Sequence, residues 1–515
     1  MDVSDAPTHS GGGGGGVVKL ASANDFITPA LACTVKPVQI DTTKKNRVLR
    51  LEGLQDDDKD GGTAAAKPKV AKVTLNDCLA CAGCITSAET VLVNQQSTEE
   101  FERMLHAAAA TPSMFDLVVV SISAAARAAL AVHSGLSLRE AHGRLTGFLK
   151  GLGCHTVLDC GVAADLSLLQ TAAEFQYRYR AQMASSTAGA TAASSLPLPV
   201  LSSSCPGWVC YAEKMLGDPL LPYLSRVKSP QQIAGTLVKH AYAASRGVAA
   251  ERVCHVTVMP CFDKKLEAAR DDFFNPNAGA SGCRDVDCVL SSGEVLQLLE
   301  QKGIADLAAV AGCEPDVEPP LSGLVPGAPS EGGAPSFAYA APGASGGAAE
   351  FVFRAAAKEL FGVDLPDGVA LPWKAGRNQD LQEVTLEHGG ATVLRFARAY
   401  GFRNIQNIVR KVKSGKSAYH FVEMMACPAG CANGGGQPRP PPLEAPTRAA
   451  AVEARLVTAG ESVRRQPHEQ PTVQALYAEG GFLAGGPLGE RAQSHLLTSF
   501  HAVDAAQQNP LTIAW

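Results

Sequence analysis

The stretch Val422–Gln437, VEMMACPAGCANGGGQ, decides how this chain must fold. The largely apolar run at 419–426 predicts a buried strand. It ends at Cys427, where a proline stops the strand, and Cys431 follows four residues later. Glycines at 434–436 would let the backbone pass close to whatever the two thiolates hold. The stretch therefore indicates a metal-binding loop at the end of a core strand.

Two other segments end in the same way. Residues 198–204 form a strand-like run that leads into Cys205, and Val253–Met259 is a β-branched run followed by Pro260 and Cys261. Ligands bind at the carboxyl ends of strands in open α/β sheets. Four thiolates, from Cys205, Cys261, Cys427 and Cys431, can therefore converge on one buried metal centre. The alternative, that these cysteines pack in the core as small apolar side chains, stays open here.

Length and composition set outer limits. A chain of 515 residues is long enough for two to four domains. Its net charge of -5 argues against a general nucleic-acid binder. We expect no membrane span, because no run of 18 apolar residues occurs, and we see no signal peptide. Fifteen cysteines without an export signal indicate a reducing compartment, in which metal sites are favoured over disulfides.

The strongest local motif is the triple of Cys78, Cys81 and Cys84. Thiolates three residues apart on a tight turn can take three corners of an iron–sulfur cubane. The fourth corner must come from elsewhere, and Cys33 is the natural candidate. A zinc knot is the alternative, although zinc usually takes cysteines in C-x2-C pairs.

The remaining pattern alternates strands with helices, which implies a largely parallel sheet. We expect a buried strand at 115–123 and helices at 124–132, 138–152, 230–246 and 350–361. Composition predicts a loop insertion at 184–199, a mobile loop at 315–349 and a proline-rich linker at 437–447. The tail at 473–503 has helical spacing.

Several of these segments resemble one family. The loops 204–208, 259–267 and 425–431 resemble the three signature loops of iron-only hydrogenases, and residues 228–232 and 285–290 look like further segments of that fold. The closest match is narrower. Cys78–Thr90, with a lone upstream cysteine, resembles the iron-only-hydrogenase-like assembly factors of the eukaryotic cytosol, also called nuclear prelamin A recognition factor-like proteins.

The resemblance implies a two-lobed α/β domain with mostly parallel sheets. We expect a flexible region at 1–70 that contributes Cys33, an N-terminal iron–sulfur segment at 71–112, the hydrogenase-like domain at 113–436, and a linker with a helical tail at 437–515. It also implies two [4Fe-4S] clusters. The first would be held by Cys33, Cys78, Cys81 and Cys84, and the second by Cys205, Cys261, Cys427 and Cys431.

The implied function is assembly of cytosolic iron–sulfur proteins. The family links early scaffold ATPases to a late targeting complex, which contains a WD-repeat propeller subunit, for delivery of clusters to apoproteins. We expect a cytoplasmic protein, with a nuclear pool also allowed, and no nucleic acid or membrane as partner. Like the tails of the family, the chain ends in an aromatic residue, Trp515, which can dock on the targeting complex.

Three positions bear on whether the chain is an enzyme. Active hydrogenases carry a proton-relaying cysteine where this chain has Ser204, and a hydroxyl is a poor proton shuttle at neutral pH. Ala429 replaces a glycine that is usual in the hydrogenase loop. Lys264, which contacts a diatomic ligand in hydrogenases, is retained. We expect no enzyme activity; a hydrogenase or other redox enzyme, and a protein whose clusters are only structural, are the competing hypotheses.

Overall fold

The computed structural model describes residues 87–503, except 112, 189–195, 280–281, 314–342, 367–368, 377, 440–444 and 458–465. All described residues belong to one of the two units into which the chain divides, the one made of residues 72–81 and 85–515. Among the described helices, none is long and apolar enough to cross a membrane.

Two sheets organise the described chain. The first, sheet A, has the strand order β2-β1-β4-β7 and is parallel throughout: β1 is Leu117–Ile122, β2 Thr156–Asp159, β4 Val253–Met259 and β7 Cys288–Ser291. The second, sheet B, has the order β3-β11-β10-β9-β8: β3 is Val200–Ser202, β8 Lys374–Ala375, β9 Leu381–His388, β10 Ala391–Tyr400 and β11 Phe421–Met425. A short hairpin pairs β5 (Phe274–Asn275) with β6 (Cys283–Arg284).

The longer helices follow the strands along the chain. They are α2 Ser87–Gln95, α3 Thr98–Ala109, α4 Ala124–His133, α5 Leu138–Gly151, α6 Gly161–Ala188, α11 Ser292–Gln301, α13 Ala348–Phe361, α14 Phe402–Lys413 and α15 Ala445–Val457. The shorter ones are α7 Pro206–Tyr211, α8 Pro230–Thr236, α9 Ala243–Ser245, α10 Asp263–Ala268, α16 Pro471–Tyr477 and α17 Glu490–Leu496. Two π-helical turns, η4 (Ala212–Leu216) and η6 (Leu237–Tyr242), continue α7 and α8.

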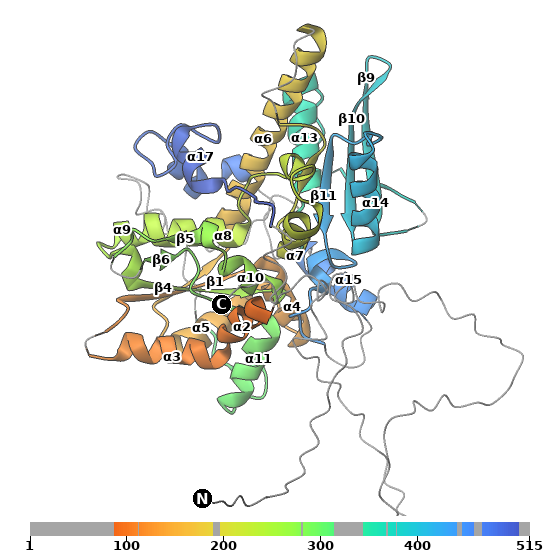
Figure 1. Ribbon diagram of the computed structural model, residues 1–515. Coiled ribbons are helices and arrows are strands. Elements are labelled where there is room, and N and C mark those ends of the chain that lie inside the picture. Colours follow the sequence, from red (N-terminus) through yellow and green to blue (C-terminus); the bar gives the residue numbers. More distant parts are fainter. Residues whose placement is uncertain are drawn as a thin grey trace, which may run out of the picture. The chain divides into compact units, whose positions relative to one another are not determined.

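Both sheets are covered on both faces, which explains why their central strands are apolar runs without alternation. On sheet A, Val118 and Val120 face the core formed with α3, α4, α5 and α11, while Leu117 and Val119 face α6, α8 and η6. Figure 1 shows α3, α5 and α11 below β1 and β4, with α8 and α9 above them. Sheet B is packed between α7 and α14 on one face and α6 and α13 on the other.

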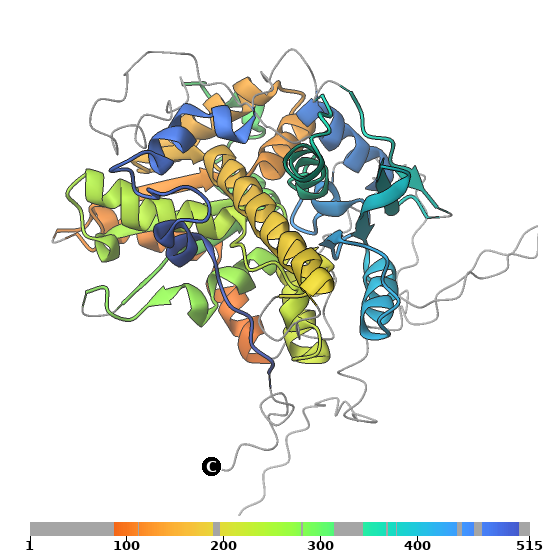
Figure 2. The same cartoon turned by 90° about the horizontal axis from the view of Figure 1, so that it is seen from above.

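Helix α6 touches the helices of both sheets, because it packs against α8 and α13. Figure 2 shows this long helix, in yellow, crossing the view between them. The sequence pattern placed a loop insertion at 184–199, and this was wrong at its start, since the helix continues to Ala188. The run of Ala, Ser and Thr there is compatible with helix once the preceding turns are packed.

The other expected elements can now be compared with the structure. The strands expected at 115–123, 198–204, 253–259 and 419–426 are found as β1, β3, β4 and β11, and the expected helices as α4, α5, α13 and the run α8–η6–α9. The expected linker at 437–447 extends too far at its end, because α15 begins at Ala445. The tail is not one helical stretch: α16 and α17 are separated by turns at 478–489. Most of the loop expected at 315–349 lies outside the described residues.

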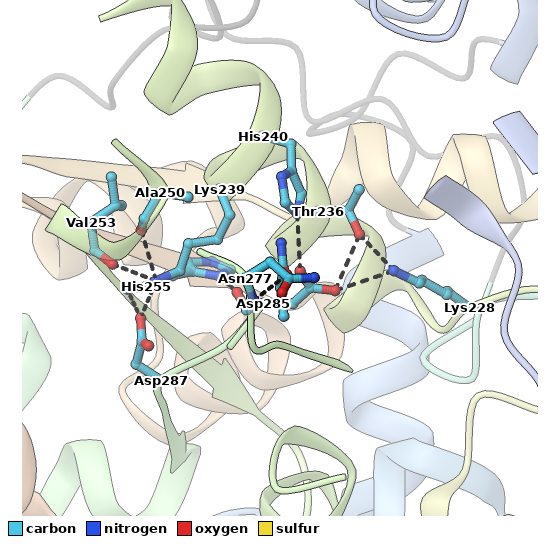
Figure 3. A network of polar contacts seen from close by, with 11 residues as sticks. Lys228, Thr236, Lys239, His240, Ala250, Val253, His255, Asn277, Asp285 and Asp287 are labelled. Atoms are coloured by element: carbon cyan, nitrogen blue, oxygen red, sulfur yellow. Dashed lines mark hydrogen bonds and ion pairs between the residues drawn. The ribbon is translucent and has the colours of Figure 1, made fainter. Parts of the chain in front are cut away.

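Charged side chains buried behind sheet A form a network with backbone groups (Figure 3). Lys239 of η6 donates to the carbonyl of Val253 and to the Asp287 carboxylate, 2.7 Å away. The Asp285 carboxylate accepts from Lys228 at 3.2 Å and from Thr236 at 3.3 Å. The network ties η6 and α8 to the loop before β7.

His255 lies at the centre of this network, fully buried on β4. Its Nδ1 lies 2.9 Å from the carbonyl oxygen of Asp285, which can only accept, so the proton is on Nδ1. Nε2 then accepts from the Ser121 hydroxyl at 2.9 Å. Burial lowers the pKa of His255 to about 4. The neutral ring is thus fully hydrogen-bonded, and its burial disfavours the charged form.

This depressed pKa predicts acid sensitivity. Between the ordinary histidine pKa of 6.5 and a folded value of about 4, the unfolded chain binds a proton that the folded chain does not. The free energy of unfolding should therefore fall as pH drops through this window, by about 3 kcal/mol from His255. Between pH 7 and 4, the free energy of unfolding of His255→Gln should fall by about 3 kcal/mol less than that of the wild type, as measured by denaturant titration. A pH dependence of the unfolding free energy that is the same in His255→Gln as in the wild type would contradict the assignment.

Candidate metal centre

The three cysteine-bearing loops come together where the two sheets meet. Cys205 follows β3, Cys427 follows the neighbouring strand β11, and Cys261 follows β4 of sheet A. Cys431 lies in the 3-10 turn Gly430–Asn433. Burial raises the pKa of Cys261 well above its ordinary value, and the charges of the other three cysteines raise it further. The structure therefore brings together all four of the thiols that the sequence predicted for the second site.

The Cys205 loop is fixed by its own neighbours. Cys205 is the N-cap of α7, and its N–H donates to the Ser203 hydroxyl at 3.0 Å, which in turn donates to the Met424 carbonyl of β11. Burial and Asp263 raise the pKa of the Cys205 thiol, whereas the backbone N–H groups of Ala426 and Trp208 lower it. These N–H groups are placed to stabilise a thiolate at this position.

Cys431 is positioned from a different part of the chain. Its N–H donates to the Ser345 hydroxyl at 3.0 Å. Burial raises the pKa of the Cys431 thiol to about 12, while Lys264 and Ser345 lower it. Sequence reasoning missed Ser345, because it lies at the edge of a glycine-rich stretch with no periodic signal.

The glycines after Cys431 bring its loop close to another part of the chain. A Cβ at Gly434 would lie 2.5 Å from the Pro260 carbonyl oxygen, and one at Gly436 would lie 2.6 Å from the Ser291 Cβ. The Gly436 N–H donates to that same Pro260 carbonyl at 3.0 Å. These glycines therefore let the Cys431 loop pack directly on the Cys261 loop, and the close approach is to protein.

One buried cation faces the thiols. Lys264 is 7% exposed, and its ammonium donates to Glu267 at 2.7 Å and to Ser229 at 3.0 Å. Its charge lowers the pKa values of Cys205 and Cys431. Glu267 and Ser229 were also missed from the sequence, although Glu267 stands three residues after Lys264 on one helix, where a pair is common.

A cavity of about 100 Å³ lies beside Cys431. It opens at the point where the connections of sheet A diverge, between the carboxyl ends of β1 and β4, the usual ligand position in such sheets. Ser204, Lys264, Gln231 and Cys160 contribute to its wall. Cys160, read from the sequence as a core residue, both packs in the core and borders this cavity.

The donor set fits a thiolate-bound iron–sulfur cluster. It consists of four grouped thiols, backbone N–H groups directed at one sulfur, and a fixed ammonium that offsets negative charge. In the described part of the chain, no group of three or more His, Cys, Asp or Glu side chains could hold a single metal ion. Cys33, Cys78, Cys81 and Cys84, predicted for the first cluster, lie outside the described residues.

Comparisons with known proteins agree with this arrangement. The family described as "Iron only hydrogenase large subunit, C-terminal domain" matches residues 116–435. Over 97% of its length the chain is 45% identical to the cytosolic iron-sulfur assembly component 3 of Mus musculus, and it covers 99% of that protein. It is 42% identical to Protein NAR1 of Arabidopsis thaliana, with 94% and 96% of the two chains covered. The chain belongs to the iron-only-hydrogenase-like family of cytosolic iron–sulfur assembly factors.

Solved structures place this assembly-factor chain beside the hydrogenases in fold. An apo form of [FeFe]-hydrogenase HydA1 from Chlamydomonas reinhardtii matches with a TM-score of 0.63 and 27% identity, over 78% of this chain and 98% of that one. A HydA structure that addresses stepwise H-cluster assembly matches with a TM-score of 0.61 and 26% identity, over 81% and 99% of the two chains. The expected two-lobed hydrogenase-like fold is confirmed.

Within this family fold, Ala429 is a strained residue between two proposed ligands. It is the one non-glycine residue of the described chain with a positive φ, 57°. Its N–H donates to Asp380 at 2.8 Å, which helps to hold the turn. The left-handed conformation costs a residue with a Cβ about 1–2 kcal/mol. The sequence singled out this position because an alanine replaces the usual glycine, and the structure shows that the replacement strains the backbone.

Ala429→Gly should therefore stabilise the protein by about 1 kcal/mol, the relief of the strain less the entropy of a glycine. Denaturant titration of the two proteins measures it. Ala432→Gly in the same loop is the matched control: Ala432 is fully buried, so the change should destabilise by about 1 kcal/mol. Destabilisation by both changes would contradict strain at Ala429.

Proposed function

We propose that this chain is a cytosolic iron–sulfur protein assembly factor that carries two [4Fe-4S] clusters and delivers clusters to apoproteins. The observation that supports it most is the grouping of Cys205, Cys261, Cys427 and Cys431 at the seam of the two sheets. The names of the relatives support the role in assembly, and the grouped cysteines support the clusters. The protein would act in the cytoplasm, with a nuclear pool allowed.

The chain's own residues would bind and protect the second cluster. The four thiols would each hold one iron, and such a cluster would supply electron-transfer capacity or be cargo for delivery. Thiols must lose protons to bind metal, so loading releases protons into a buried site. The N–H groups of Ala426 and Trp208, together with Lys264, favour the deprotonated form and offset the cost of burial.

The first cluster would be held by Cys33, Cys78, Cys81 and Cys84. This assignment depends on the C-x2-C-x2-C spacing and on the family resemblance. Helix α2, which starts at Ser87 directly after the triple, packs against α10, the helix that begins two residues after Cys261.

Metal analysis tests the cluster content. After anaerobic reconstitution we expect about eight irons per chain and two paramagnetic signals on reduction. Cys431→Ser should remove about four irons and one signal, and Cys78→Ser the other four. Cys283→Ser, a buried cysteine with no proposed metal role, is the control and should keep all eight. Zinc as the bound metal, or a single cluster in the wild type, would contradict the proposal.

The competing function is hydrogen turnover, which the fold alone would allow. We propose that the chain does not catalyse it, because the cavity wall presents a Ser204 hydroxyl where a relay thiol would be needed. A serine hydroxyl does not ionise at neutral pH, so it passes protons poorly.

The reconstituted protein should therefore produce no hydrogen when supplied with a strong chemical reductant, as followed by gas chromatography. Ser204→Cys should stay inactive as well, because the sequence gives no sign that a diiron unit is delivered to this chain. Turnover by the wild type at rates comparable to those of a hydrogenase, measured in parallel as the positive control, would replace assembly with redox catalysis as the function.

The partners we propose are the early scaffold ATPases and the late targeting complex with its WD-repeat propeller subunit. Trp515 is the proposed anchor for the latter. A terminal indole with a free carboxylate can fill a pocket and take charged hydrogen bonds at the same point.

Deletion of Trp515 should weaken binding to the targeting complex by roughly tenfold or more, as expected for an aromatic hot spot, while iron content stays unchanged. Titration by calorimetry or a pull-down measures the loss. Leu511→Ala, another apolar change in the same tail, is the control and should have a small effect. Binding unaffected by the deletion, or iron lost with it, would show that Trp515 is no anchor.

A further inference from the structure

The last described segment of the chain, Leu497–Val503, follows α17 and contains no helix; we call it the C-terminal strap. Its first half pairs with the stretch that leads to Ser229. The Lys228 N–H donates to the Leu496 carbonyl at 2.8 Å, and the Thr498 N–H donates to the Arg226 carbonyl at 2.7 Å. The next residue after Lys228 is Ser229, whose hydroxyl accepts a hydrogen bond from the Lys264 ammonium. This end of the strap is therefore attached next to a residue that holds Lys264.

The second half of the strap is fixed to the helix that starts at Cys205. The N–H groups of His501 and Val503 donate to Glu213, to its carboxylate at 3.1 Å and to its backbone carbonyl at 3.2 Å. Glu213 belongs to η4, which continues α7 directly. Its carboxylate also takes an ion pair from Arg270 at 2.6 Å.

Between these two attachments the strap packs beside the loop that carries Cys205. Phe500 packs against the core cluster that contains Cys205 and Trp208. Thr498 and Phe500 also line a small pocket of about 30 Å³, whose other walls include Ser203, Pro206, Ser229 and Glu267. Ser203 and Pro206 belong to the Cys205 loop, whereas Ser229 and Glu267 accept hydrogen bonds from Lys264. No other part of the described C-terminal tail, 466–503, lines this pocket.

The strap is also weakly attached compared with the core that it covers. Ser499, His501 and Ala502 are exposed, and Phe500 is only partly buried. Solvent-exposed backbone hydrogen bonds and little buried apolar area are the signature of a segment that opens locally well before the fold does. Cys205 itself is buried, at 8% exposure, and Phe500 of the strap packs against the core cluster to which it belongs.

We propose that the C-terminal strap is a lid on the Cys205 side of the metal centre and that its detachment exposes this side for cluster delivery. The link to a partner rests on the function proposed above. Trp515 is the twelfth residue after Val503, a reach of about 40 Å when extended. A partner that takes Trp515 therefore lies close to the lid, and it favours the open state if the docked strap obstructs its surface.

Site-resolved alkylation of the full-length chain tests the lid without needing a cluster or a partner. The protein is stripped of iron, kept reduced without oxygen and treated with iodoacetamide, and the labelling rate of each cysteine is read by mass spectrometry. Phe500→Ala and a chain ending at 497 should label Cys205 at least tenfold faster than wild type. A chain ending at 503 keeps the strap but lacks Trp515, and it should behave as wild type.

Two controls separate lid opening from general loosening. Phe482→Ala removes an aromatic ring of the same tail that packs beside His495 and against a different core cluster from the one that contains Cys205, and it should leave Cys205 protected. Cys254 and Cys288, fully buried in sheet A, are internal references that should not change in any variant. Acceleration of all buried cysteines together, or unchanged Cys205 labelling in the chain ending at 497, would overturn the proposal.

Iron release from the reconstituted protein to a chelator gives the second measurement. The chain ending at 497 should lose the iron of the second cluster several times faster than the chain ending at 503. Equal rates would refute the lid even if Trp515 proves to bind the targeting complex. Conversely, a lid that opens as described would stand even if Trp515 proves to have no partner, so the two proposals fail separately.

Discussion

The structure depends on one constraint: four thiols must lie close together, away from water, where their deprotonated forms are disfavoured. Burial raises the pKa values of Cys205, Cys261 and Cys431, and each charge near Cys261 makes the next one harder to form. The protein opposes this with fixed positive partners rather than with water: N–H groups at Cys205, and the Lys264 ammonium locked by Glu267 and Ser229. The site is thus poised for a ligand that brings its own positive charge.

The two-sheet architecture meets this constraint with rigid elements. Strands β3 and β11 are neighbours in sheet B, so Cys205 and Cys427 leave the same edge, while β4 brings Cys261 from sheet A. Strand ends in a packed sheet are well-determined positions, and loops that start from them are short. Ser203 and Ser345 then fix the backbone at Cys205 and Cys431 by single hydrogen bonds. The precision of the centre comes from these supports as much as from the cysteines.

The apolar runs and the Pro or Cys residues that end them were enough to predict the strands that lead to the cysteines. Each of them is a buried apolar run that ends at Pro or Cys, and in β4 the predicted bounds match those of the structure. The strands β9 and β10 were not predicted, because they form an antiparallel pair in which polar and apolar residues are mixed. The supports of the site could not be predicted, because Ser345 and Glu267 become meaningful only when distant segments meet. Composition misled at Ala445, where an alanine-rich helix follows prolines directly.

The contact between Gly436 and Pro260 has a consequence for how the protein matures. After β11 the chain leaves sheet B, passes through Cys431 and attaches to sheet A, where Gly436 bonds Pro260 and Gln437 reaches the Ala125 carbonyl at 3.1 Å. Each sheet can form its own strands first, but the thiols meet only after this crossing is made. A cluster bound there would act as a clasp between the two halves of the molecule. Loading would then be the final step of folding, and the empty protein would be the form whose halves come apart most readily, and so the form most open to proteolysis.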